Sequence, residues 1–173
     1  MRRFLVTVLT LLVVSTASAR EYLSFDLKRL ITAVETPSGK KASLDIPYLD
    51  QILNDLSDHA INYPPQFDTP QDQQRATQDV LALSKMLDML IDIPSPNPEL
   101  LVRAGHVNSM GHNLDIAGAG EKASIIFQRL LTAVPAHPRG NFLYGTLLAG
   151  GGKPKEALPY LEKALSVGLT DAA

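Results

Sequence analysis

Apolar residues recur at steps of three and four along much of the chain, a spacing that places them on one face of an α-helix. One such stretch runs from Pro47 to Asn62 and is followed by Pro64-Pro65, which terminates it. Its apolar face consists of Leu49, Ile52, Leu53, Leu56, Ala60 and Tyr63. We expect an amphipathic helix whose apolar face lies in the protein core.

A second and longer pattern begins at Thr69, a typical N-cap, which is followed by Pro70 at the first helical position and by Asp72 three residues after the cap. Its apolar positions are Ala76, Val80, Leu83, Leu87 and Leu90. They alternate between steps of four and three without interruption. The pattern therefore predicts one unbroken helix that ends before Pro94.

The segment from Glu21 to Val34 is harder to assign. Its apolar residues Leu23, Leu27, Leu30, Ile31 and Val34 fit one helical face. The β-branched residues at its end also suit a paired strand, so that alternative stays open, although we favour the helix. The glycine and proline of the following residues 36–41 are typical of an exposed turn.

The first 19 residues have the organisation of a secretory signal peptide. Arg2 and Arg3 precede an uncharged run from Phe4 to Ala19, and small residues occupy the positions 17–19 that a signal peptidase reads. The alternative, a membrane anchor, is disfavoured because this run is short for a bilayer core of ~30 Å. We expect cleavage after Ala19, export to the periplasm, and no stable membrane span in the mature protein.

A proline-rich connector separates residues 20–97 from the rest of the chain. Asn97 is placed to cap the next helix and Pro98 to open it. From there the chain contains an internal repeat, because residues 104–137 align with 138–171 at an offset of 34 without a gap. The identical pairs are Gly111 with Gly145, Leu114 with Leu148, Gly118 with Gly152, Ala123 with Ala157, and Leu131 with Leu165.

This repeat resembles the tetratricopeptide repeat (TPR), a helix-turn-helix unit of 34 residues. Gly111 and Gly145 fall within the first helix of each pair, where a missing side chain lets the second helix approach closely. Gly118 and Gly152 fall at the turn between the helices. The resemblance implies an all-α fold in which residues 98–171 form a short α-solenoid behind an N-terminal helical region. The second copy departs from the family pattern in having Leu169 where a proline is usual.

TPR proteins bind a peptide or a partner helix in a groove lined by their first helices. The resemblance therefore implies a groove for a protein or peptide partner, with Phe142 as its apolar anchor and Arg139 as its charged one. The groove positions carried over by alignment are Asn108, His112, Asp115, Arg139, Phe142 and Thr146. The clamp with which some members grip a terminal carboxylate is not supported, because Asn108, His112 and Leu143 occupy the relevant positions.

Composition narrows the remaining functions. The chain of 173 residues has a formal net charge of −2 and lacks any long basic run, which argues against nucleic acid as a partner. It contains no cysteine, which excludes disulfides and thiolate chemistry. His112 and Asp115 lie three residues apart, but two ligands make a weak metal site, so we expect no metal and no cofactor.

The combined interpretation is a non-enzymatic interaction protein of the cell envelope. A structural subunit of a permanent assembly is the main alternative, and an enzyme with its site in the N-terminal region, among Asp45, Asp50, Asp55 and Asp58, is a remote one. The last helix has Leu158, Leu161 and Leu165 on one face with no later helix to cover them. We therefore expect either a fragment of a longer repeat array or self-association through this face.

Overall fold

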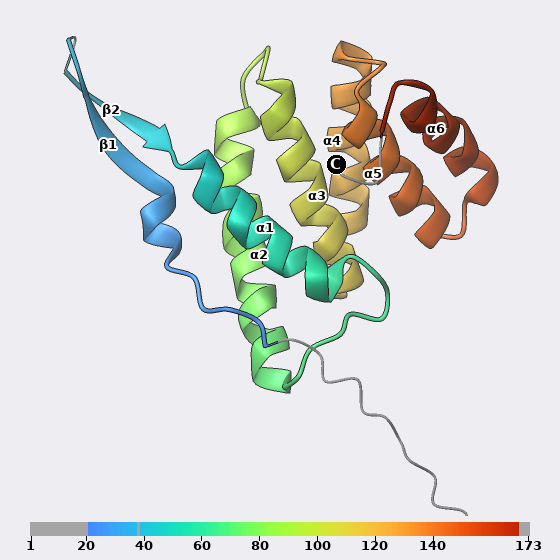
Figure 1. Ribbon diagram of the computed structural model, residues 1–173, viewed down its shortest axis with the longest axis horizontal. Coiled ribbons are helices and arrows are strands. Elements are labelled where there is room, and N and C mark those ends of the chain that lie inside the picture. Colours follow the sequence, from blue (N-terminus) through green and yellow to red (C-terminus); the bar gives the residue numbers. More distant parts are fainter. Residues whose placement is uncertain (1–20, 38, 170–173) are drawn as a thin grey trace, which may run out of the picture.

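The computed structural model describes residues 21–37 and 39–169, and the expected signal peptide lies outside this range. The described chain is all-α in class, as predicted, with one small hairpin of strands near its beginning (Figure 1). Its helices are α1 (Ile46–Ala60), α2 (Pro70–Ile91), α3 (Pro98–Asn113), α4 (Ala119–Ala133), α5 (Pro138–Gly150) and α6 (Pro154–Ser166). In the described part of the chain, no helix is both long and apolar enough to cross a membrane.

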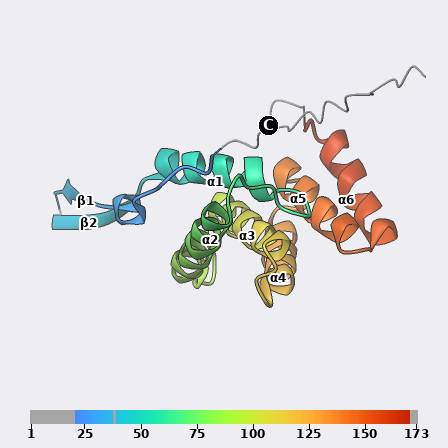
Figure 2. The same ribbon diagram turned by 90° about the horizontal axis from the view of Figure 1, so that it is seen from below.

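The hairpin corrects the helix that we favoured for residues 21–34. A short 3-10 helix at Leu27–Leu30 leads into β1 (Ile31–Thr36), which pairs in antiparallel fashion with β2 (Gly39–Leu44). The β-branched residues of β1 suit a strand, and Gly39 adopts a φ of 110° that allows the chain to turn back. The hairpin projects away from the helices (Figures 1 and 2).

The helix boundaries follow the capping residues closely. The side chains of Asp45, Thr69 and Asn97 accept hydrogen bonds from the first turns of α1, α2 and α3. The predicted caps at Thr69 and Asn97 are thus confirmed. The face predicted for α1 is buried as far as Ala60, where the helix ends, but Tyr63 lies beyond it and is 68% exposed.

Helices α3 to α6 form two consecutive hairpins, α3 with α4 and α5 with α6. Gly118 and Gly152, which are 34 residues apart, both precede the second helix of a pair and have a left-handed φ, of 75° and 77°. The interhelical turns predicted there are confirmed. A Cβ on Gly145 would lie 2.7 Å from Leu161, so a side chain there would hold α5 and α6 apart.

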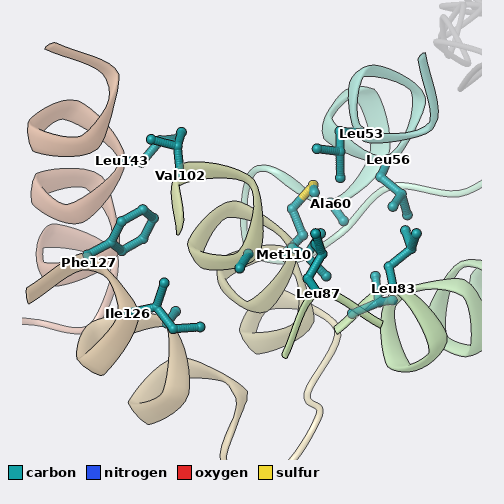
Figure 3. Packing of buried hydrophobic residues seen from close by; sticks show 14 of the residues in the cluster. Leu53, Leu56, Ala60, Leu83, Leu87, Val102, Met110, Ile126, Phe127 and Leu143 are labelled. Atoms are coloured by element: carbon teal, nitrogen blue, oxygen red, sulfur yellow. The ribbon is translucent and has the colours of Figure 1, made fainter. Parts of the chain in front are cut away.

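The core runs through the whole helical stack. Helix α2 packs on α3, α3 on α4 and α4 on α5, while α1 lies across α3 (Figure 2). Leu53 and Leu56 of α1 meet Leu83 and Leu87 of α2 beside Met110 of α3 (Figure 3). This arrangement fixes the relative positions of α1, α3 and α5, which frame the site described next.

Candidate functional site: a cleft between α3 and α5

A cleft of about 790 Å³ lies between α3, α5 and the loop that leaves α1. We call it the α3–α5 cleft. Its apolar wall consists of Ile61, Tyr63, Met110, Phe142, Leu143 and Leu147. The rings of Tyr63 and Phe142 are 68% and 39% exposed, which leaves aromatic surface open to a ligand.

The loop after α1 is fastened to α3 by one side chain. Asn113 Nδ2 donates hydrogen bonds of 2.9 Å to the carbonyl oxygens of both Ala60 and Ile61. The other end of the loop folds back on α1, because the amide of Gln66 donates to the carbonyl oxygen of His59 at 2.7 Å. The cleft therefore has a wall that is held in place before any ligand binds.

The buried His106, which lines the cleft, forms a polar network with the partly buried Ser57 and Arg139. The Ser57 hydroxyl donates to the carbonyl oxygen of Leu53 at 2.7 Å, so it accepts from Nε2 of His106, 3.3 Å away. Nδ1 of His106 is then the acceptor for the Arg139 guanidinium at 3.4 Å. Burial, and secondarily the charge of Arg139, lowers the pKa of His106 to about 4.

Ser57 and His106 are residue types that serve as nucleophile and base in hydrolases, but their hydrogen bonds do not have the directions that catalysis needs. A general base must accept the hydroxyl proton, whereas the Ser57 proton is directed to Leu53 and His106 is protonated on the nitrogen that faces Ser57. Ser109, which also lines the cleft, donates to the carbonyl oxygen of Gly105 within its own helix at 3.0 Å. Neither serine is activated by these contacts.

Arg139 differs from the other arginines of the described chain in its partners. Arg75 and Arg103 bind carboxylates, Arg129 donates to backbone carbonyl oxygens, and Arg29 stacks over a tyrosine ring. The guanidinium of Arg139 has the neutral His106 nitrogen as its hydrogen-bond partner, and among the described residues it forms no ion pair. Most of its five donors thus remain available to a ligand.

The structure brings together four of the six predicted groove residues. His112, Asp115, Phe142 and Thr146 all line the α3–α5 cleft, together with His106 of α3. Arg139 lies at its edge through the contact with His106. Asp115 stands just beyond α3 in a left-handed conformation with a φ of 58°.

Asn108 is the exception, because it does not line the cleft. It is 3% exposed, accepts a hydrogen bond of 2.8 Å from Ser84 of α2, and donates to the carbonyl oxygen of Ala104. Alignment of the two copies transfers the same face from each helix. His112 and Thr146, which are equivalent in the two copies, both line the cleft, but Asn108, the position equivalent to Phe142, points from α3 toward α2.

Tyr63 and Ile61 are cleft residues that the sequence did not reveal as such. Their placement depends on Asn113, which is more than 50 positions away in the chain and carries no local signal for this contact. In the described residues, no group of three or more His, Asp or Glu side chains is placed to hold a metal ion. The lining of the cleft thus combines apolar side chains with polar ones, among them the buried His106.

No family model matches the chain, and comparisons with curated proteins and with solved structures found no match. The resemblance to TPR proteins is accordingly supported only by the sequence and structure of this chain. It consists of the 34-residue internal repeat and of two helical hairpins whose turns carry equivalent left-handed glycines.

Proposed function

We propose that this protein is a non-enzymatic interaction module of the TPR type, which binds a peptide segment of a partner protein in the α3–α5 cleft. The observation that carries the proposal is the cleft, which is lined by two exposed aromatic side chains, Tyr63 and Phe142. Such surfaces bind apolar side chains at low entropic cost, because aromatic rings have few rotatable bonds.

The preformed geometry of the cleft supports a binding role. Asn113 holds one wall and α3 and α5 form the others, so little backbone ordering is needed when a ligand enters. The volume of about 790 Å³ suits a few side chains of a peptide. The signal-like pattern of residues 1–19 supports a location in the bacterial cell envelope as part of this proposal.

Selection from a library of random dodecapeptides, displayed between two fixed linkers, tests the proposal with the purified protein. We expect selected peptides to bind at least ten-fold more weakly to Phe142→Ala than to the unmodified protein, as measured by fluorescence anisotropy. Ile125→Ala is the matched control, because Ile125 is 60% exposed on α4 and does not line the cleft. Binding that ignores Phe142 and Tyr63 would reject the cleft as the site.

A structural subunit of a permanent assembly is the second candidate. It is favoured by α6, where Leu158 and Leu165 are 55% and 72% exposed on the outer face of the last described helix. An obligate assembly would cover these side chains. Measurement of the native mass of the protein in envelope extracts separates a stable complex from a free module.

A further inference from the structure

The charges around the α3–α5 cleft are few and separated. Asp115 is the carboxylate among its lining residues and follows the C-terminal end of α3. Arg139 is in the first turn of α5, one helical turn before Phe142. Arg139 does not line the cleft itself, but it contacts His106, which does, so a cation lies at the edge of the cleft and an anion, Asp115, in its lining.

Arg139 is held in place by a hydrogen bond to a neutral side chain and not by a carboxylate. A guanidinium with a carboxylate partner inside its own protein has little affinity left for another, as with Arg103, which Asp50 binds through two hydrogen bonds. His106 supplies a contact that positions Arg139 without neutralising its charge, because the imidazole is neutral. The guanidinium donors of Arg139 are therefore held in position and remain free to bind a carboxylate.

From this juxtaposition we infer that the partner's segment carries an acidic side chain, which pairs with Arg139 while an adjacent apolar side chain packs on Phe142. This inference rests on the proposed function and names its ligand more closely. The occupant is an internal peptide segment with Asp or Glu next to a large apolar residue. A carboxylate bound by a guanidinium in a partly enclosed cleft forms charge-assisted hydrogen bonds, which discriminate strongly against a basic residue at that place.

Positioning by His106 also sets a geometric requirement. Arg139 would bind the acidic side chain at the edge of the cleft, while the apolar side chain packs on Phe142. Because Arg139 and Phe142 lie one turn apart on α5, the acidic and apolar side chains of the ligand must occur at a fixed short spacing. The library should therefore yield a motif and not merely an acidic composition.

The experiment selects the linker-flanked dodecapeptide library separately on the unmodified protein and on Arg139→Glu. We expect the unmodified protein to enrich Asp or Glu at a fixed offset from a large apolar residue, and Arg139→Glu to enrich Lys or Arg at the same offset. Acidic peptides from the first selection should bind Arg139→Glu at least ten-fold more weakly. Lys163→Glu, on α6, is the matched control for the change in net charge and should leave binding unaltered.

The outcomes distinguish the two claims. Peptides that depend on Phe142 but have no acidic position, or that bind Arg139→Glu equally well, would overturn this inference and leave the proposed function standing. Failure to select any peptide that depends on Phe142 would overturn both. If Arg139→Glu loses its helical circular dichroism signal, Arg139→Gln replaces it, and the same ten-fold loss is expected. Synthetic peptides with a free or an amidated C-terminus form the last arm, and a requirement for the free terminus would also refute an acidic side chain.

Discussion

The hydroxyl of Tyr22 donates a 2.8 Å hydrogen bond to Oδ2 of Asp79, 57 residues further along the chain. Tyr22 is completely buried, and its carbonyl oxygen accepts a hydrogen bond of 2.9 Å from Arg75. Burial, reinforced by the bond to Asp79, raises the pKa of the Tyr22 hydroxyl above its ordinary value. The extended residues before the hairpin are in this way pinned to α2.

We expect Tyr22→Phe to lower the free energy of unfolding by ~1 to 3 kcal/mol, because the partly buried Asp79 carboxylate loses its donor. Tyr22→Ala should cost ~3 to 5 kcal/mol, since it also leaves a cavity. Urea denaturation followed by circular dichroism measures both. Tyr63→Phe is the control, because Tyr63 is exposed, and it should be within ~0.5 kcal/mol of the unmodified protein. Equal costs for the two tyrosines would contradict the role of Asp79.

The sequence predicted the helices well because their signals are local. The side chains of Thr69 and Asn97 accept hydrogen bonds from amides two or three residues away, so these caps can be predicted without knowledge of the fold. The hairpin was missed because Ile31 fits a helical face as well as a strand, and its partner Leu44 is remote along the chain. The site was predicted only in part for the same reason. His106 contacts Arg139, which is 33 positions later in the sequence, and no local sequence pattern predicts that contact.

A second prediction concerns the close approach of α3 and α4. A Cβ on Gly105 would lie 2.5 Å from the ring of Phe127, which is completely buried. Gly105→Ala should therefore destabilise the protein by ~1 to 3 kcal/mol, as overpacking does. Gly150→Ala is the matched control at the end of α5, where a Cβ meets nothing within 4 Å. It should be neutral or should stabilise by up to ~1 kcal/mol. The reverse order of melting temperatures would refute this packing.

A third prediction follows from the pKa of His106. The folded value of about 4 lies below the ordinary value of 6.5, so between these pH values the unfolded chain binds a proton that the folded chain excludes. The contribution is constant above pH 6.5 and stability is lost as the pH falls from 6.5 toward 4, by up to ~3 kcal/mol.

His106→Leu should remove this part of the pH dependence. Its unfolding free energy, compared with that of the unmodified protein at pH 7 and at pH 4.5, should fall less steeply with acidification. His112→Leu is the control, because His112 is exposed, and its curve should run parallel to that of the unmodified protein. An unchanged slope in His106→Leu would show that His106 titrates equally in both states.

A fourth prediction concerns export. If the signal is removed after Ala19, protein isolated from the envelope begins at Arg20 and retains Tyr22, which the fold requires. N-terminal sequencing measures the cleavage site. A variant cleaved after Tyr22 instead should be less stable by an amount similar to that of Tyr22→Ala. An intact Met1, or recovery of the protein in the cytoplasmic fraction, would reject export.

The last prediction concerns the outer face of α6. We expected three exposed leucines there, and the structure leaves Leu158 and Leu165 largely exposed while Leu161 packs partly against Gly145. Because these leucines are 55% and 72% exposed, roughly 2 to 4 kcal/mol of burial is unrealised, at ~1.5 to 3 kcal/mol for a fully exposed side chain. The purified protein should therefore bind a hydrophobic dye and increase in mean mass with concentration in sedimentation experiments. Leu158→Glu combined with Leu165→Glu should suppress both effects without loss of helical signal, because neither side chain belongs to the core.

Ile125→Glu adds one negative charge on an exposed apolar position of α4 and serves as the control. Self-association that persists in the double variant would assign it to another surface, and a monomer at all concentrations would refute the prediction.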